Sequence, residues 1–216
     1  MRRIVDILND ALARTLPVLG GATIQCRHPS EGGDMKAFWK LLLLVAAGGP
    51  LAPTAFAQDP DAGDPWESLR YFVGAWKGTG TGLGGEATLE HRYRFVLQDK
   101  FLHTTTRSVF PATEERDGEI HEDWGMFSFD VERGTLVLRQ FLTEGFVNTY
   151  VLSDRSDDGQ RLVFTSEDSE NSDFGARITY EILSPSEYEA RLELAPPGKD
   201  FFECRFMRLK KVTAEP

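Results

Sequence analysis

The chain has few cysteines. Its 216 residues hold only Cys26 and Cys204. Cys26 precedes the predicted cleavage site described below, so the mature protein would keep Cys204 alone, which excludes an intrachain disulfide. A single cysteine within an aromatic stretch is typical of a small core residue rather than a nucleophile.

Basic residues are also in the minority. The chain carries 24 Lys and Arg against 34 Asp and Glu, a formal net charge of −10. Nucleic acids and anionic membrane surfaces are bound by clusters of Lys and Arg. The composition therefore argues against both as partners.

Established catalytic motifs are missing. The sequence holds neither Gly-x-Ser-x-Gly nor His-Glu-x-x-His, so no catalytic residue is predicted. A Gly-x-Gly-x-x-Gly sequence at residues 80–85 matches the dinucleotide fingerprint in letters. That fingerprint requires a following helix, whereas residues 86–98 have a strand pattern, so we interpret the glycines as strand or loop.

No apolar run is long enough to cross a bilayer, which takes about 20 residues. The run Leu41–Ala47 follows Lys36 and Lys40 and precedes Ala55-Phe56-Ala57. This is the order of regions in a secretory signal peptide, predicted here at residues 35–57. Residues 58–216 would then be exported, to the periplasm or outside the cell, with no membrane insertion after cleavage.

Residues 1–34 precede this signal. One interpretation is a misassigned start codon, with Met35 as the true first residue and residues 1–34 as a non-native extension. The other is an amphipathic helix with Ile4, Leu8, Leu12 and Leu16 on one face. Both place the folded domain at residues 58–216.

The mature segment alternates apolar and polar residues over most of its length. A short helix at residues 65–73, with Asp64 as N-cap, comes first. The runs with strand character are residues 75–82, 86–98, 100–111, 119–131, 135–145, 146–155, 161–168, 176–184, 187–195 and 201–212. This predicts an all-β domain, a single antiparallel barrel of roughly ten strands, since closure removes exposed edges.

The start of this domain is similar to a known family. Phe72-Val73-Gly74-Ala75-Trp76 resembles the Gly-x-Trp opening of the calycins, which include lipocalins and nitrobindins. Within them the chain is most similar to the nitrobindin-like branch and to uncharacterised bacterial exported proteins. The resemblance implies that Gly74 and Trp76 close one barrel end, with Arg205 or Arg208 from the last strand packed across the Trp.

The same resemblance raises haem as a cofactor. Nitrobindins bind haem through a His near the C-terminal strands, but this chain has no His after His121. The cofactor therefore stays open at this point. A haem- or nitrogen-oxide-binding barrel is one alternative function.

Several polar residues stand in otherwise apolar middle strands. The candidate ligand-binding residues are Arg107, Glu122, Trp124, Ser128, Arg139, Gln140, Asn148 and Tyr150. Glu144 shares the pattern without an assigned role. Side chains alternate along a strand, so a register shift of one residue would reverse which of them face inward.

The neighbouring His121-Glu122-Asp123 sequence resembles a set of metal ligands. His121 and Asp123 would share one strand face, with Glu122 and Trp124 on the other. Two ligands are too few without His91 or His103 from neighbouring strands, so no metal site is predicted.

The predicted function is an exported barrel that binds a small, partly apolar molecule in its interior. The candidate apolar lining is Phe95, Phe101, Trp124, Phe127, Phe141 and Phe146. Two alternatives besides haem binding are open. One is an enzyme using His121, Glu122 and Tyr150, and the other is a ligand-free interaction module with an acidic surface at Glu167, Asp168, Glu170 and Asp173.

Overall fold

A computed structural model describes residues 64–114 and 116–212. The predicted signal peptide at residues 35–57 and the predicted extension at residues 1–34 lie outside these residues. No helix in the described part of the chain is long and apolar enough to span a bilayer.

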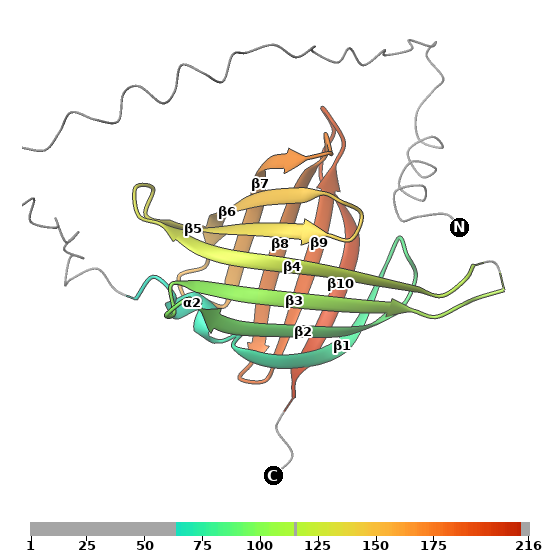
Figure 1. The fold of residues 1–216 in the computed structure, drawn as a ribbon, viewed down its shortest axis with the longest axis horizontal. Helices are drawn as coiled ribbons and strands as arrows, with labels where there is room; N and C mark the ends of the chain where they lie inside the picture. Colours follow the sequence, from blue (N-terminus) through green and yellow to red (C-terminus); the bar gives the residue numbers. More distant parts are fainter. Residues whose placement is uncertain (1–63, 115, 213–216) are drawn as a thin grey trace, which may run out of the picture. The chain divides into compact units, whose positions relative to one another are not determined.

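Within the described residues, ten antiparallel strands form a closed barrel (Figure 1), which confirms the predicted fold. The strands are β1 (Gly74–Gly82), β2 (Ala87–Val96), β3 (Phe101–Phe110), β4 (Glu119–Asp130), β5 (Thr135–Leu142), β6 (Val147–Arg155), β7 (Arg161–Glu170), β8 (Gly175–Ser184), β9 (Glu187–Ala195) and β10 (Phe202–Lys211). Each strand pairs with the next along the chain, and β1 pairs with β10 to complete the ring.

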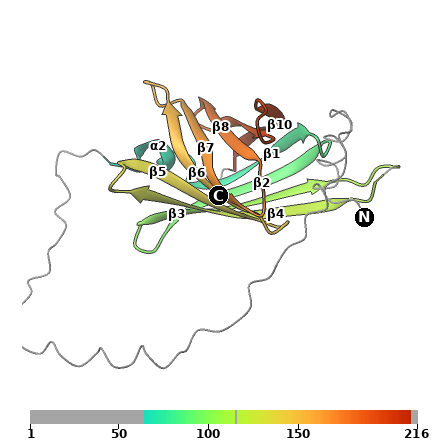
Figure 2. The same cartoon turned by 90° about the horizontal axis from the view of Figure 1, so that it is seen from above.

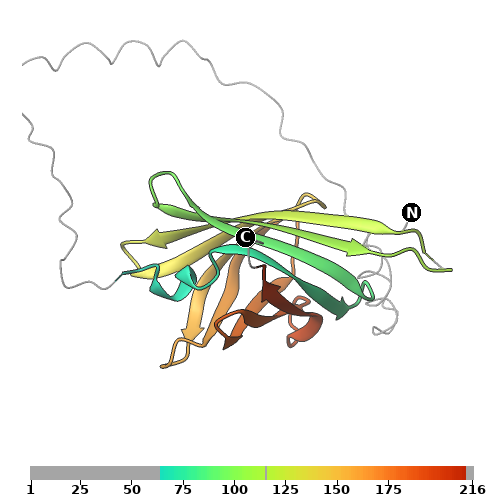
Figure 3. The ribbon, with the colours of Figure 1, turned by 90° about the horizontal axis from the view of Figure 1, so that it is seen from below.

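Two groups of strands form facing layers of the barrel wall. Figures 1 and 2 show the green and yellow strands β2–β5 as one curved layer facing the orange and red strands β7–β10. The hairpin of β3 and β4 extends beyond its neighbours, as Figure 3 shows from below. Alternate side chains of each strand enter the space between the layers.

One end of the barrel is filled by aromatic side chains. The helix α2 (Glu67–Arg70) lies there, and Phe72 packs on Tyr93, Tyr180 and Tyr188 at ring-centroid distances of 5.1–5.5 Å. We call this the closed end.

The helix is shorter than predicted. It begins at Glu67 with Trp66 as N-cap, so the predicted cap at Asp64 is wrong. The Asp64 carboxylate instead accepts a hydrogen bond from the Trp66 backbone N–H at 3.0 Å, in the turn before the helix.

The glycines of residues 80–85 belong to β1 and the turn that follows it, and β2 begins at Ala87 without an intervening helix. A Cβ at Gly82 would lie 2.2 Å from the backbone oxygen of Cys204, so this glycine allows the two strands to approach closely. The structural interpretation of this motif is confirmed.

Candidate binding cavity

The barrel interior holds a cavity of about 370 Å³. It lies toward the end opposite the closed end, where residues of the β1–β2, β5–β6 and β7–β8 connections line it: Leu83, Gly84, Glu144, Phe146, Asn171, Ser172, Asp173 and Phe174. We call this end the mouth. The volume falls in the range of roughly 300–1,000 Å³ that small-molecule sites occupy.

The two walls of the cavity differ in chemistry. The wall from β8 and β9 is mostly apolar and contributes Ala176, Ile178, Ala190, Leu192 and Leu194. The opposite wall, from β3 and β4, is polar and contributes Thr104, Thr106, Ser108, His121 and Asp123. This division suits a molecule with one polar and one apolar side.

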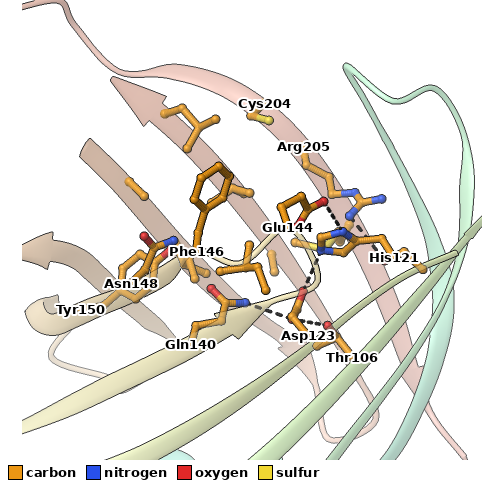
Figure 4. Close-up of a pocket in the computed structure, with 18 of the residues that line it drawn as sticks. Thr106, His121, Asp123, Gln140, Glu144, Phe146, Asn148, Tyr150, Cys204 and Arg205 are labelled. Atoms are coloured by element: carbon orange, nitrogen blue, oxygen red, sulfur yellow. Dashed lines mark hydrogen bonds and ion pairs between the residues drawn. The ribbon is translucent and has the colours of Figure 1, made fainter. Parts of the chain in front are cut away.

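A buried histidine lies at the centre of the polar wall (Figure 4). The Nδ1 of His121 is 2.8 Å from Glu144 Oε1, and its Nε2 is 3.2 Å from Asp123 Oδ2. Asp123 also accepts hydrogen bonds from the Thr106 hydroxyl and, at 3.1 Å, from the Gln140 amide. The three ionisable side chains are only 8–12% exposed.

The protonation of this cluster follows from its contacts. Burial alone would lower the pKa of His121, but hydrogen bonds and charge from Asp123 and Glu144 outweigh it and raise the pKa to about 9. The imidazolium in turn lowers the pKa of Asp123 against the opposing effect of burial. At neutral pH His121 is therefore a cation, and it lies between the side chains of Asp123 and Glu144.

Arg205 of β10 lies beside this cluster. Its Nη1 donates a hydrogen bond to the Ser108 hydroxyl at 3.4 Å, and its guanidinium stacks over the Phe110 ring at 4.7 Å from the centroid. Burial lowers the pKa of Arg205, while the charge of Asp123 opposes that shift. A register shift between Glu203 and Arg205 marks a bulge in β10 at this point.

A second histidine lies deeper, toward the closed end. His91 Nδ1 is 2.9 Å from the Tyr188 hydroxyl, which is 3.4 Å from the Tyr93 hydroxyl. Burial lowers the pKa of His91 to about 4, so its ring is neutral at pH 7. Burial also raises the pKa of both tyrosines, which remain uncharged.

Three of the predicted ligand-binding residues line the cavity, namely Gln140, Asn148 and Tyr150. The Asn148 amide donates to the Tyr150 hydroxyl at 3.1 Å. Burial raises the pKa of Tyr150, which keeps its phenol protonated. A role in the interior therefore remains a prediction for these three residues.

The other five lie on the outer face and do not line the cavity. These are Arg107, Glu122, Trp124, Ser128 and Arg139. Arg107 and Glu122 do form an ion pair, at 3.4 Å, but their side chains are 42% and 60% exposed. The inward and outward faces of β3, β4 and β5 are thus the reverse of those needed for these residues to touch an interior ligand.

The closed end also differs from the expectation for the last strand. Trp76 is fully buried and donates its indole N–H to the Phe72 carbonyl at 2.6 Å, and Gly74 begins β1 with φ 124°. The cation over the Trp76 ring is Lys211, at 5.2 Å from the centroid. The assignment of Arg205 or Arg208 to this place is corrected.

Neither arginine reaches the Trp76 ring. Arg205 pairs in register with Gly82, six residues along β1 from Trp76. Arg208 is half-exposed and forms ion pairs with Glu189 and Glu187.

The ionic cluster itself was not predicted as a site. The expected division of faces is confirmed, since His121 and Asp123 line the cavity while Glu122 and Trp124 are exposed. The sequence feature that could have indicated the cluster is the pair of polar residues, His121 and Asp123, at alternate positions of one strand. Glu144 completes the cluster from the β5–β6 connection, and no local pattern links it to His121.

The donors on the cavity wall do not fit a haem held by the last strands. There β10 presents Cys204, Arg205 and Met207. Burial raises the pKa of the Cys204 thiol, whereas the thiolate is the metal ligand. His121 already contacts a carboxylate at each ring nitrogen, and no group of three or more His, Cys, Asp or Glu within residues 64–114 and 116–212 could hold a metal ion.

Comparison with known proteins supports the fold. No family model matches the chain, and no curated protein matches it. The crystal structure of Rv2717c from M. tuberculosis is similar, with a TM-score of 0.50 and 15% identity over 69% of this chain and 98% of that one.

Two designed proteins also match. A redesigned β-barrel has a TM-score of 0.35 and 10% identity over 68% of this chain and 96% of its own. A de novo fluorescence-activating β-barrel has a TM-score of 0.34 and 11% identity over 67% of this chain and 97% of its own. The fold assignment does not rest on these two designs. Strand pairing and cavity lining together define, within the described residues, a ten-stranded antiparallel barrel whose interior has one polar and one apolar wall.

Proposed function

We propose that this protein is a binding barrel that takes a small, partly apolar molecule into its interior. The observation that carries the proposal is the cavity of about 370 Å³, with an apolar wall from β8 and β9 opposite a polar wall from β3 and β4. Barrels of about this strand number can enclose a single small ligand.

The binding proposal can be tested by native mass spectrometry of the protein purified without denaturant. A stoichiometric extra mass that is released on unfolding is expected. The variant Ala190→Phe would place a ring in the cavity and should abolish the extra mass. The matched variant Thr179→Phe places the same ring on the outer face of neighbouring β8 and should retain it.

One combined result would contradict the binding proposal. It is a bare protein mass together with one of two dye results: the uncharged dye N-phenyl-naphthylamine does not bind, or it binds the Ala190→Phe variant as well as the wild type. A barrel with a usable cavity should bind such an apolar dye even if its natural ligand is lost in purification.

We further propose that the barrel is calycin-like. A short helix precedes β1, the Gly74-Ala75-Trp76 opening places Trp76 in the closed end, and a cation of β10 lies over its ring. These features agree with the pattern that the family resemblance implies, with Lys211 in place of an arginine.

Export is a separate proposal, supported by the sequence of residues 35–57. Expression of the full chain in a bacterium with a secretory pathway should yield an exported protein whose first residue is Gln58. Intact-mass measurement of the exported and retained fractions would test this. An unprocessed chain confined to the cytoplasm would contradict it.

A further inference from the structure

The polar end of the cavity contains a partly buried cation without a direct ionic partner. Within the described residues no carboxylate lies within 4.0 Å of the Arg205 guanidinium nitrogens, although Asp123 and Glu144 are close enough to affect its pKa. Its Nη2 is buried and has no hydrogen-bond partner among these residues. A buried guanidinium N–H without an acceptor is costly, and an acceptor from a ligand would relieve that cost.

Glu144 carries a buried acceptor without a hydrogen-bond donor in the described part of the chain. Its side chain is nine-tenths buried, and Oε1 contacts His121 at 2.8 Å. The other oxygen, Oε2, is buried without a hydrogen-bond donor among the described residues. The same end of the cavity thus has one donor that needs an acceptor and one acceptor that needs a donor.

The four ionisable side chains of the cluster are formally balanced. His121 and Arg205 are basic, Asp123 and Glu144 are acidic, and Asp173, which also lines the mouth, is exposed to solvent. A charged ligand group would add a net charge beside ionisable side chains that are only 8–12% exposed, and an uncompensated buried charge is strongly unfavourable. An uncharged polar group leaves the balance intact.

We propose, building on the binding function above, that this end recognises an uncharged group that both accepts and donates hydrogen bonds, such as a primary carboxamide on an apolar body. The ligand carbonyl would accept from Arg205, and the ligand N–H would donate to Glu144. A carboxylate would face Glu144 with like charge, and an ammonium would face Arg205 in the same way. The apolar body would lie along Ile178, Leu192 and Leu194.

The first experiment measures displacement of N-phenyl-naphthylamine from the wild-type protein at pH 7 by octanamide, octanoate and octylamine. These three share one apolar chain and differ in the head group. Octanamide should displace the dye at a concentration at least about tenfold lower than either charged compound, as expected for hydrogen bonds to charged protein groups.

Variants that remove one charge should change the order in which the three compounds displace the dye, and the two variants should favour opposite ligand charges. Glu144→Gln leaves an excess positive charge, so octanoate should gain at least about tenfold relative to octanamide. Arg205→Met leaves an excess negative charge, so octylamine should gain instead. The matched variants Glu122→Gln and Arg208→Met change the same charges on the outer face and should keep the wild-type order.

The two proposals fail in different ways. If the dye binds but the three compounds displace it equally, or a charged one displaces it best, the carboxamide proposal is wrong and the binding barrel stands. The same holds if none of them displaces a bound dye. If the dye does not bind, or binds the Ala190→Phe variant as well as the wild type, the binding function fails, and the ligand class with it. Since the wild-type series decides the matter, an unfolded variant would leave the test intact.

Discussion

Two histidines lie inside the same barrel and are held in opposite charge states. His121, near the mouth, contacts two carboxylates, and its pKa rises to about 9. His91, near the closed end, contacts the Tyr188 phenol, and burial lowers its pKa to about 4. Both rings are buried, at 7% and 5% exposure, so burial alone does not decide the charge. The partners do.

The difference extends to the regions around them. The closed end is stabilised by packed aromatic rings and by hydrogen bonds among uncharged groups, which require His91 to stay neutral. The mouth end keeps four charged side chains in the interior, an arrangement that seldom stabilises a fold better than apolar residues would. Charges kept at such a cost are more readily explained by binding than by stability.

The largest expected effect is at the closed end. Trp76→Ala removes ring packing on Tyr188, at 4.8 Å between centroids, and the hydrogen bond to the Phe72 carbonyl. We expect a loss of about 4–5 kcal/mol in the free energy of unfolding, measured by urea denaturation. Trp124→Ala, on the outer face at 64% exposure, should change it by less than about 1 kcal/mol. Equal losses at the two sites would disprove the closed end as the main packed region.

The second effect concerns the mouth. His121→Leu removes the cation between Asp123 and Glu144 and leaves two buried carboxylates without it. We expect a loss of about 3 kcal/mol at pH 7, diminishing at pH 4, because burial raises the pKa of Asp123 once His121 no longer lowers it. Urea denaturation at both pH values measures this. The control His103→Leu changes a histidine on the outer face, next to Trp124, and should show neither the loss nor its pH dependence.

The two histidines also predict opposite pH limits of stability. The raised pKa of His121 gives a contribution that is complete below its unfolded value of 6.5 and is lost as the pH rises through 9. The lowered pKa of His91 has the reverse sign. Its neutral form stabilises the fold fully above pH 6.5, and the contribution is lost as the pH falls towards 4. Stability should therefore be greatest near neutral pH.

The variant His91→Gln tests the predicted loss of stability at acid pH. Tyr93 and Tyr188 beside this ring stay neutral, and the charges that act on it come from Asp123 and Arg205. The variant should lose less stability between pH 7 and pH 5 than the wild type, by about 2 kcal/mol. Proton NMR titration of the ring resonances gives the direct measurement. A His91 that titrates near pH 6.5 would refute the assignment.

The sequence predicted the barrel because every strand is bounded by turn residues and alternates in polarity. It did not determine which alternate residues face the interior. Arg107, Glu122, Ser128 and Arg139 lie on the outer face, as polar residues commonly do, and Trp124 lies there although it is apolar. Ile120, Trp124 and Phe141 are 51%, 64% and 50% exposed, while His121 and Asp123 face inward. The rule that apolar residues face the core gives the wrong face where the core is a polar cavity.

The contacts that complete the site could not be predicted from the sequence for a second reason. Glu144 meets His121 across 23 residues, and Arg205 meets Ser108 across 97. Such pairs depend on the register of several strands together, and a shift of one residue in any of them would separate the partners. Local patterns determine strands, and long-range register determines the site.

The smallest predicted effect tests which cation of β10 belongs to the closed end. Lys211 lies over the Trp76 ring and donates to the Tyr71 carbonyl at 3.3 Å. Lys211→Met should lower the free energy of unfolding by about 1 kcal/mol, whereas Lys210→Met, at 73% side-chain exposure, should change it by less than about 0.5 kcal/mol.

A double-mutant cycle separates the cation–ring contact from general effects on β10. Combining Lys211→Met with Trp76→Leu should give a coupling energy of about 0.5–1 kcal/mol, because each single change already removes the contact. The cycle of Arg205→Met with Trp76→Leu should give a value near zero, since Arg205 lies at the opposite end of the strand pair. A larger coupling for Arg205 would restore it to the closed end and remove it from the polar wall on which ligand recognition is proposed.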